Sequence, residues 1–328
     1  MIRYFDAEPY IENNYPFVII IGGRGIGKTY STLRTVTEKN IMHMYLRNSD
    51  KIMQICSSEM GNPYKAINED FSTDYQFHMT KDGTAMIQDA NNENKIVGYG
   101  CALSTFSNLR GVSMPEIKVV VYDEFLEIVH GKSKQADWFF NLYETVNRNR
   151  ELQGKPPLKV IMLANSLSIE NAILSEFGII STIEGMVRSG QRKVSIPEKG
   201  IMILLPYLDD LANAKRDTAL YRATQDSSYY AMAIENRFTE NDFSDIQKKA
   251  NIYEYIPVCC YCGVYIYNHK SDGTLYACNI YADCPSFDEN KRLAFRRRYG
   301  AYLKSAIIDG RMKFQNYAAK YLLTDALM

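Results

Sequence analysis

VIIIGGRGIGKTYS, residues 18–31, joins an apolar run to four glycines, a lysine and a threonine. The apolar run predicts a buried strand, and residues 30–39 are compatible with a helix. The pattern G-x-x-x-x-G-K-[ST] is satisfied by Gly22, Gly27, Lys28 and Thr29. This pattern, between a strand and a helix, is typical of a phosphate-binding P-loop. The stretch therefore predicts an α/β fold that binds a nucleotide.

A loop of this kind binds phosphate through its backbone and through two side chains. Glycines let successive N–H groups point at phosphate oxygens, and the following helix adds the positive end of its dipole. Lys28 is expected to reach the β- and γ-phosphates, and Thr29 to hold Mg²⁺ through its hydroxyl. The expected nucleotide-binding residues are Gly22, Gly23, Arg24, Gly25, Ile26, Gly27, Lys28, Thr29 and Tyr30. A glycine-rich turn without chemical importance is the alternative, and the complete strand–loop–helix order argues against it.

Length and composition set outer bounds on the fold and its partners. With 328 residues, 46% of them hydrophobic, the chain can bury a large core and form about two domains. The 38 basic and 38 acidic residues cancel, so net charge does not indicate a polyanionic partner. No apolar run approaches the ~18 residues of a membrane span, and the start MIRYFDAEPY does not resemble a signal peptide. We expect an intracellular protein without a membrane partner and, given seven cysteines, reduced thiols.

Four apolar runs predict strands, and helix-compatible stretches separate them. The runs are residues 17–21, 44–47, 118–122 and 159–164. Strands that alternate with helices are typical of a parallel sheet covered by helices. Between the second and third runs, residues 77–104 carry the turn signals Asp82-Gly83 and Asn91-Asn92, which predict inserted antiparallel strands.

The pattern of alternating strands and helices ends near residue 205. We expect a P-loop domain at residues 1–205, a helical linker at 206–227 and a smaller α+β domain at 228–328. In the last of these, IPVCCYCGVYIYNHKSDGTLYACNIYA (256–282) predicts two strands around a Ser-Asp-Gly turn, and a helical tail follows. The segment VCCYCGVYIYNH (258–269) is interpreted as one strand.

A nucleotide-hydrolysing enzyme needs carboxylates near its P-loop. IKVVVYDEF (117–125) is an apolar strand that ends in Asp123, which is expected to hold the water shell of Mg²⁺. Glu124 is expected to polarise the attacking water as general base. An acidic pair that merely ends a strand is the alternative, and the upstream P-loop favours the catalytic interpretation.

Two further elements carry polar residues at informative places. The helical run FFNLYETVNRNREL (139–152) ends with Arg148 and Arg150, and in ring-forming P-loop motors an arginine after the Asp-Glu strand can enter a neighbour's site. A solvated helix end is the alternative. The next strand, LKVIMLANS (158–166), ends in Asn165 beside the expected nucleotide cleft. Its amide can bond the γ-phosphate or the attacking water.

Together these stretches resemble the DNA-encapsidation ATPases of small short-tailed phages, a picovirinae-type family in the terminase-like branch of ring ATPases. The matching stretches are GGRGIGKTY, VVVYDEF, TVNRNRE and LANSLSIENAILSEF, in that order, and the resemblance covers residues 16–177. It implies an additional-strand, terminase-like ATPase domain. It further implies a homopentameric ring in the host cytoplasm, transiently at the capsid portal vertex. There ATP hydrolysis would drive double-stranded DNA into the capsid, with a packaging RNA in some members.

The resemblance also implies roles for particular residues. The P-loop lysine falls on Lys28, the acidic pair on Asp123 and Glu124, the trans-acting arginine finger on Arg148, and the coupling asparagine on Asn165. Arg24 also matches the family and is expected to contact phosphate from its own subunit. Arg150, two residues beyond Arg148, is the alternative candidate for the arginine finger.

The smaller domain lacks the acidic residues of an active nuclease. Two-metal cleavage needs three or four converging carboxylates, and VCCYCGVYIYNH contains none. We therefore expect a vestigial ribonuclease-H-like fold that binds nucleic acid or a capsid component. Five cysteines lie within residues 259–284 without a C-x-x-C knuckle, which favours small buried side chains over a zinc site.

The tail is strongly basic. Residues 291–320 hold nine basic residues and one acid, Asp309. The basic residues are Lys291, Arg292, Arg296, Arg297, Arg298, Lys304, Arg311, Lys313 and Lys320, and the interleaved aromatic residues are Tyr299, Tyr302, Phe314 and Tyr317. Such a patch suits phosphate backbones, with DNA, packaging RNA or the portal as partner. A solvated helix face over core aromatics is the alternative.

Three other functions stay open. A large-terminase-like motor with an active nuclease would need the missing carboxylates. A non-motor P-loop kinase would fit Lys28 but leave the inserted strands and the basic tail without a role. A non-hydrolytic binding protein with a degenerate P-loop disagrees with the intact Lys28, Thr29, Asp123 and Glu124.

Overall fold

The computed structural model describes residues 3–106, 114–126, 132–166, 168–238 and 244–328, and in the first turn of the helix at 132–147 it describes only the backbone. The chain divides into two compact units. The first consists of Met1–Phe177 and Met186–Glu240, and the second of Gly178–Gly185 and Asn241–Met328. None of the helices in these described ranges combines the length and apolar composition that a membrane crossing requires.

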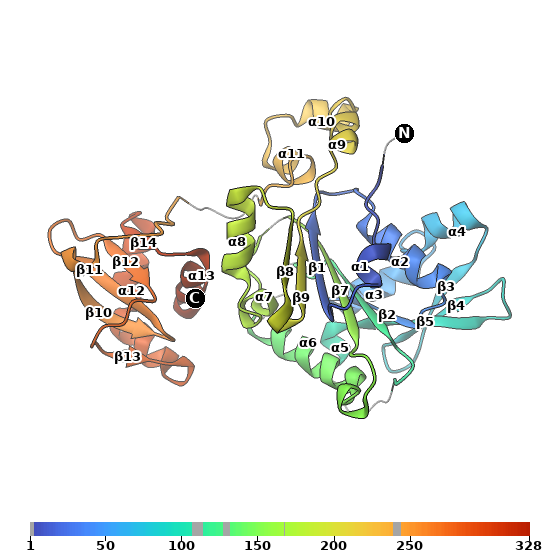
Figure 1. Cartoon of the computed structure of the whole chain (residues 1–328), viewed down its shortest axis with the longest axis horizontal. Coiled ribbons are helices and arrows are strands. Elements are labelled where there is room, and N and C mark those ends of the chain that lie inside the picture. Colours follow the sequence, from blue (N-terminus) through green and yellow to red (C-terminus); the bar gives the residue numbers. More distant parts are fainter. Residues whose placement is uncertain (1–2, 107–113, 127–131, 167, 239–243) are drawn as a thin grey trace. The chain divides into compact units, whose positions relative to one another are not determined.

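A mixed sheet of nine strands forms the centre of the first unit's described residues, in the order β3-β4-β5-β2-β6-β7-β1-β9-β8 (Figure 1). Its strands are β1 (Phe17–Gly22), β2 (His43–Arg47), β3 (Tyr75–Met79), β4 (Ala85–Asp89), β5 (Lys95–Ala102), β6 (Val119–Asp123), β7 (Lys159–Asn165), β8 (Lys193–Ile196) and β9 (Ile201–Leu204). The four predicted strands are β1, β2, β6 and β7, and all four are confirmed. Four neighbouring pairs in the middle of the sheet are parallel: β2 with β6, β6 with β7, β7 with β1, and β1 with β9.

Helices cover both faces of this sheet. The helices of the first unit are α1 (Glu8–Ile11), α2 (Lys28–Glu38), α3 (Asp50–Cys56), α4 (Lys65–Phe71), α5 (Leu103–Phe106), α6 (Lys132–Asn147), α7 (Ala172–Glu176), α9 (Asp209–Arg216), α10 (Ala219–Ala223) and α11 (Ser228–Ala233), with 3₁₀ turns η1 (Glu151–Gln153) and η2 (Pro197–Lys199). Helix α8 (Ile180–Ser189) contributes residues to both units.

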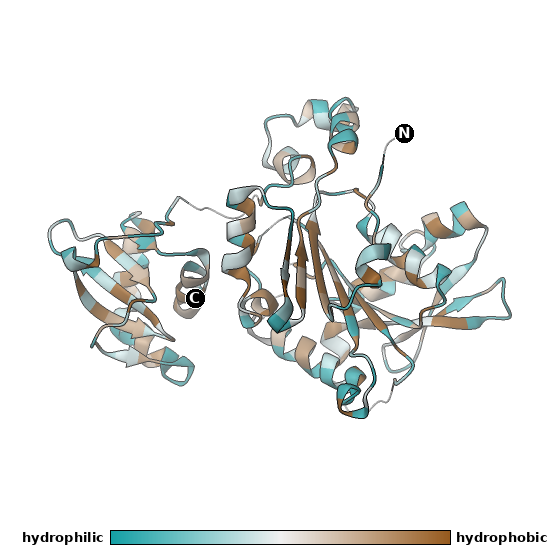
Figure 2. Cartoon of the chain, viewed as in Figure 1, coloured by the Kyte–Doolittle hydropathy of each residue, from teal (hydrophilic) through white to brown (hydrophobic). Residues whose placement is uncertain are grey.

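The strands are apolar on both sides because both sides are buried. On one face Val18 of β1 and Val121 of β6 belong to the same buried cluster as Leu33 of α2. On the other face Tyr122 stacks on Phe139 of α6, with ring centroids 5.8 Å apart. Figure 2 shows the central strands as the most hydrophobic ribbons of this unit.

The inserted region forms antiparallel strands, as predicted. Strand β4 pairs antiparallel with β3 and with β5. The sequence did not reveal that β5 also pairs in parallel with β2, through the register His43↔Gly98. The insertion therefore extends the central sheet instead of standing apart from it.

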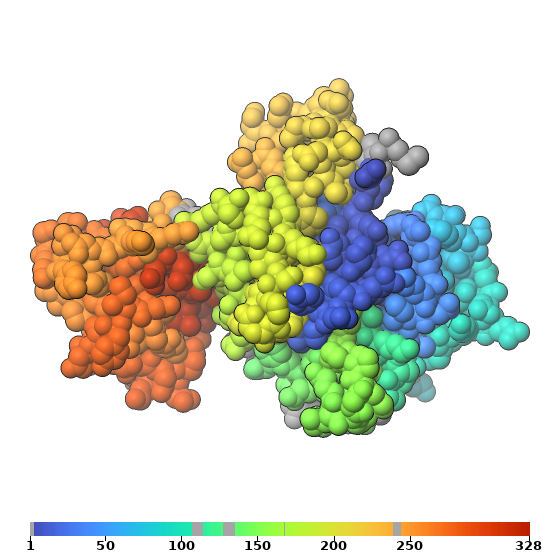
Figure 3. All heavy atoms as spheres, in the orientation of Figure 1, coloured from blue at the N-terminus to red at the C-terminus, as the bar shows by residue number. Residues whose placement is uncertain are grey.

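Residues 206–227 are helical, but they belong to the first unit instead of linking two domains. Helices α9, α10 and α11 share a buried cluster that includes Ala212, Tyr221 and Tyr230. Figure 3 shows them as the yellow lobe of the first unit. The boundary between units falls at Glu240–Asn241, later than the expected residue 228, because this cluster continues through α11.

The second unit holds a five-stranded sheet in its described residues, in the order β13-β10-β11-β12-β14. Its elements are η3 (Ile252–Glu254), β10 (Tyr255–Tyr261), β11 (Val264–His269), β12 (Leu275–Cys278), β13 (Ser286–Phe287), η4 (Glu289–Lys291), α12 (Arg292–Ile308), β14 (Met312–Phe314) and α13 (Tyr317–Leu327). The hairpin around the Ser-Asp-Gly turn, β11–β12, and the helical tail are confirmed. The ribonuclease-H-like assignment stays a prediction.

One sequence interpretation of this unit was wrong. Residues 258–269 are not a single strand, because the chain reverses at Cys262-Gly263 and β10 pairs antiparallel with β11. Both turn residues have positive φ, 46° and 81°, as a two-residue type I′ hairpin turn requires. Cys262 therefore lies exposed in the turn, whereas Cys259, Cys260 and Cys278 are buried in the sheet.

Candidate active site

The carboxyl ends of β1, β7 and β6 bring the predicted site residues together. Strand β7 lies between β1 and β6, and Gly22 is paired in register with Asn165. Asp123, at the end of β6, lies opposite Leu163 of β7. Ligands of open α/β sheets bind at this edge. A cavity of about 210 Å³ opens there, lined by Arg24, Gly25, Ile26, Gly27, Lys28, Thr29, Tyr30, Asp123, Glu124, Ala164 and Asn165.

The loop between β1 and α2 depends on its glycines at three places. Gly25 and Gly27 have φ values of 67° and 92°, which side chains rarely permit. A Cβ atom on Gly23 would lie 2.7 Å from the carbonyl oxygen of Ala233 in α11. The backbone of α11 therefore lies directly against the P-loop.

Lys28 is buried at the start of α2. Its Nζ donates to the carbonyl oxygens of Gly22 (3.0 Å) and Gly23 (2.8 Å) and to Oδ1 of Asn165 (3.2 Å). Burial lowers the pKa of Lys28 to about 8, although the Asp123 carboxylate opposes the shift. A phosphate group beside this ammonium would stabilise its charged form.

Thr29 and Asp123 bring hard oxygen ligands together. The Thr29 hydroxyl lies 3.1 Å from both carboxylate oxygens of Asp123. The Tyr45 hydroxyl donates to Oδ2 of the same carboxylate at 3.0 Å. Burial raises the pKa of Asp123, and the guanidinium of Arg47 opposes that shift. Tyr45, at the middle of β2, was not among the predicted site residues.

Glu124 is held by a residue that the sequence analysis missed. Its carboxylate forms an ion pair with Arg47 at the end of β2. Arg47 also donates to the Tyr45 hydroxyl (3.2 Å), and its Nη1 lies 3.8 Å from Asp123. The backbone of Glu124 has φ = 53°, a conformation that costs energy for a side chain of this kind and is often found at functional sites. An arginine at a strand end carries no motif, so only the pairing of β2 with β6 reveals it.

Lys215 of α9 is a second unpredicted cation near the P-loop. Its ammonium donates to the carbonyl oxygen of Arg24, and burial lowers its pKa. The charge of Lys215 contributes to the lowered pKa of Lys28. The Arg24 side chain itself is exposed at the cavity.

Arg148 and Arg150 do not lie in this site. Helix α6 ends at Asn147, whose Oδ1 accepts from the backbone N–H of Leu158, just before β7 begins. Both arginines therefore lie at the amino edge of the sheet, a strand length of roughly 20 Å from the P-loop. Arg148 is exposed, with φ = 41°. Arg150 is half-buried and donates to the carbonyl oxygens of Pro115 (2.8 Å) and Ile117.

The basic tail of the second unit is only partly a free surface. Arg292 pairs with Asp325, Arg311 with Asp309, and Lys313 and Lys320 with Asp245. Of the four interleaved aromatic residues, Phe314 and Tyr317 are buried in the core. Tyr302 is exposed and Tyr299 is half-buried. The exposed basic side chains of α12 are Arg297, Arg298 and Lys304.

A P-loop at the end of β1 and an Asp-Glu pair at the end of β6, with β7 between the two strands, are the arrangement of a P-loop ATPase domain. The chain belongs to the podovirus DNA encapsidation protein (Gp16) family, whose model matches residues 3–322.

Individual relatives agree with this assignment. The chain is 23% identical to the DNA packaging protein of Bacillus phage B103 over 318 residues, which cover 90% of this chain and 92% of that protein. A chain of the bacteriophage Phi-29 viral genome packaging motor assembly has the same fold, with a TM-score of 0.64, 18% identity and 99% coverage of both chains. A chain of the Phi-28 gp11 DNA packaging motor gives a TM-score of 0.62 at 15% identity, covering 99% of this chain and 98% of the other.

Proposed function

We propose that this protein is an ATP-driven motor that moves double-stranded viral DNA into a preformed capsid. Membership of the DNA encapsidation family indicates the process. The observation that carries the proposal is the meeting of Lys28, Asp123 and Glu124 at one edge of the sheet, because this set can bind and hydrolyse ATP.

The residues at this edge fit ATP and Mg²⁺. Magnesium prefers oxygen ligands and takes one or two from the protein, the rest from water and substrate phosphates. Thr29 and Asp123, whose oxygens are 3.1 Å apart, would hold the ion, Asp123 mainly through water. When bound, Mg²⁺ neutralises charge on the phosphates. Lys28 would bind the β- and γ-phosphates, with Asn165 beside it.

Glu124 would act as the general base once its carboxylate is released from Arg47. In this ion pair the guanidinium of Arg47 occupies Oε2 of Glu124, one of the two oxygens that could accept the proton of the attacking water. Arg47 is therefore a positioning residue, which holds Glu124 beside Asp123 until the substrate water is in place. An arginine from a neighbouring subunit would add positive charge that stabilises the transition state.

The position of Arg148, away from the P-loop of its own subunit, supports assembly into an oligomer. We propose a homo-oligomeric ring, pentameric by family resemblance, in which Arg148 of one subunit completes the site of its neighbour. The ring would act in the host cytoplasm at the capsid portal, with a packaging RNA as a further partner. The second unit would bind nucleic acid or the capsid, without nuclease activity.

A direct test measures ATP hydrolysis and solution mass together. We expect Mg²⁺-dependent ATPase activity that double-stranded DNA stimulates, in a species several times the mass of one 37.6 kDa chain. A kinase would transfer phosphate to a small acceptor without DNA stimulation. Activity that is confined to a monomer and ignores DNA would contradict the motor.

The exposed cations of α12 give a second prediction. Replacing Arg297, Arg298 and Lys304 with alanine should weaken binding of the full chain to its nucleic acid or capsid partner and flatten the salt dependence of binding, because each lost phosphate contact lowers the slope. Arg296 is left in place, since it donates to the carbonyl oxygen of Met328 at 2.7 Å.

The matched control removes three exposed lysines of the same unit, Lys248, Lys249 and Lys270. The measurement is a binding titration with double-stranded DNA, RNA and portal protein at several salt concentrations. Equal losses in both triple variants would mean that general charge, not the α12 surface, carries the interaction.

A further inference from the structure

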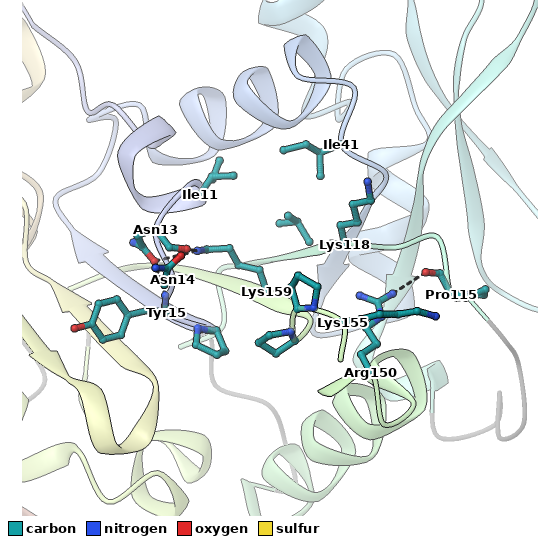
Figure 4. A pocket seen from close by; sticks show the side chains of 14 residues that line it. Ile11, Asn13, Asn14, Tyr15, Ile41, Pro115, Lys118, Arg150, Lys155 and Lys159 are labelled. Atoms are coloured by element: carbon teal, nitrogen blue, oxygen red, sulfur yellow. Dashed lines mark hydrogen bonds between the residues drawn. The ribbon is translucent and has the colours of Figure 1, made fainter. Parts of the chain in front are cut away.

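A second and larger cavity lies at the amino edge of the central strands, at the opposite end from the P-loop (Figure 4). Its volume is about 650 Å³. Its walls come from α1, residues 13–16 before β1, residue 41 before β2, residues 115–119, and the loop from 150 to the start of β7. The strands between the two cavities are five to seven residues long, roughly 15–20 Å, so the sites are separate.

Four cations line this cavity, and none of its 14 lining residues is acidic. The cations are Lys118, Arg150, Lys155 and Lys159. Their hydrogen bonds go to neutral oxygens: Arg150 to the carbonyls of Pro115 and Ile117, Lys155 to Oε1 of Gln153, and Lys159 to Asn13. Lys118 and Lys155 are exposed. The cavity therefore has an excess of positive charge on its own walls.

Lys159 is the most informative of the four. Its side chain is 9% exposed, and its ammonium donates to the backbone carbonyl and to Oδ1 of Asn13 (3.0 Å). Burial lowers its pKa to about 8. A buried ammonium bonded to neutral oxygens is costly, and an anion in the cavity would reduce that cost.

Apart from Asn13, Asn14 and Tyr15, the remaining walls are aliphatic side chains and prolines. Ile11, Ile41 and Val119 contribute aliphatic surface, and four prolines line the same space: Pro16, Pro115, Pro156 and Pro157. Proline fixes φ, so these loops have little freedom to rearrange. A cleft or cavity of 300–1,000 Å³ with mostly apolar walls and a few polar groups is typical of a small-molecule site.

We propose that this cavity binds a nucleotide, at a site distinct from the P-loop. Lysine ammoniums and an arginine guanidinium are the groups that recognise phosphate. Inorganic phosphate alone would leave the Ile11, Ile41 and proline surfaces uncovered, whereas a base and sugar would cover them. The ligand class is therefore a phosphorylated molecule with an apolar ring.

Equilibrium dialysis of the full chain with radiolabelled ATP tests the proposal. The unmodified protein should bind two ATP molecules per chain. The Lys118→Ala, Lys155→Ala double variant should retain the P-loop site and lose affinity for the second at least about tenfold, the cost of roughly one strong charge contact. Lys28→Ala should retain only the second site, and the triple variant neither. Both replaced lysines of the cavity are exposed, so the fold is expected to survive.

The matched control is Lys65→Ala, Lys81→Ala, which removes two exposed lysines of the same unit and should bind two ATP molecules. One ATP per chain that Lys28→Ala abolishes would overturn the second site and leave the proposed motor intact. If the unmodified chain bound one ATP and only the Lys118→Ala, Lys155→Ala variant lost it, the result would support the cavity site and contradict the P-loop assignment. Inorganic tripolyphosphate or a short single-stranded DNA that competes as well as ATP would overturn the nucleotide assignment.

Discussion

Replacing Arg148 with alanine is expected to lower the ATPase rate by ~10³- to 10⁵-fold while ATP binding survives. An arginine finger acts on charge that develops in the transition state, so its loss affects turnover and not ground-state affinity. Arg148 cannot act on its own P-loop, because it lies at the amino edge of the sheet beyond the start of β7. Steady-state kinetics and a nucleotide-binding titration measure the two effects separately.

Mixing two inactive variants tests whether Arg148 acts on a neighbouring subunit. Arg148→Ala retains Glu124, and Glu124→Gln retains Arg148, so a mixed ring contains some interfaces with both groups. We expect partial recovery of hydrolysis in mixed rings verified by mass. Mixed rings without recovery would contradict action in trans.

Arg150→Ala is the comparison variant for the finger. The carbonyl groups of Pro115 and Ile117 already hold its guanidinium, so it is expected to affect stability more than turnover. If Arg150→Ala lost hydrolysis while Arg148→Ala kept it, the role would pass to Arg150.

Replacing Glu124 with glutamine is expected to leave ATP bound but unhydrolysed, with a loss of ~10²- to 10⁴-fold in turnover. The amide keeps the shape of the side chain but cannot accept the proton of the attacking water. Lys28→Ala should instead abolish binding or turnover, because the lysine contacts the phosphates in the ground state. ATP affinity and single-turnover hydrolysis distinguish the two variants.

The control for this pair is Glu59→Gln, an exposed glutamate of the same unit, which should behave as the unmodified protein. Thermal unfolding curves check that each chain folds, since Lys28 is buried and bonds three oxygen atoms. Near-normal hydrolysis by Glu124→Gln would remove Glu124 from the role of base.

The central residues of the site could be predicted because they belong to short sequence motifs. The P-loop spacing places Lys28 and Thr29, and a strand that ends in Asp-Glu places Asp123 and Glu124. Arg47 and Tyr45 could not be found in this way. They reach the site only because β2 pairs with β6, and strand order is a property of tertiary structure that a single sequence does not encode locally.

The fold shows the same division between local and non-local information. Strands β1, β2, β6 and β7 follow from their apolar runs, whereas the parallel pairing of β5 with β2 does not. The hairpin at Cys262-Gly263 was missed because a cysteine rarely occupies a left-handed turn position, so the only local signal was one glycine. Helices α9 and α10 lie in the stretch that was recognised as helical, whereas α11 was not recognised, and the buried cluster that joins all three within the first unit was not visible in the sequence.

The close approach of Gly23 to Ala233 has a mechanical consequence. A Cβ atom on Gly23 would lie only 2.7 Å from the carbonyl oxygen of Ala233, so there is no room for a side chain between the P-loop and α11. Protein interiors packed this tightly pass on a displacement instead of absorbing it. A shift of the loop on release of phosphate would therefore displace α11, the last helix of the first unit within its described residues. Glycine at position 23 is therefore the residue that lets the P-loop and the end of α11 lie in direct contact.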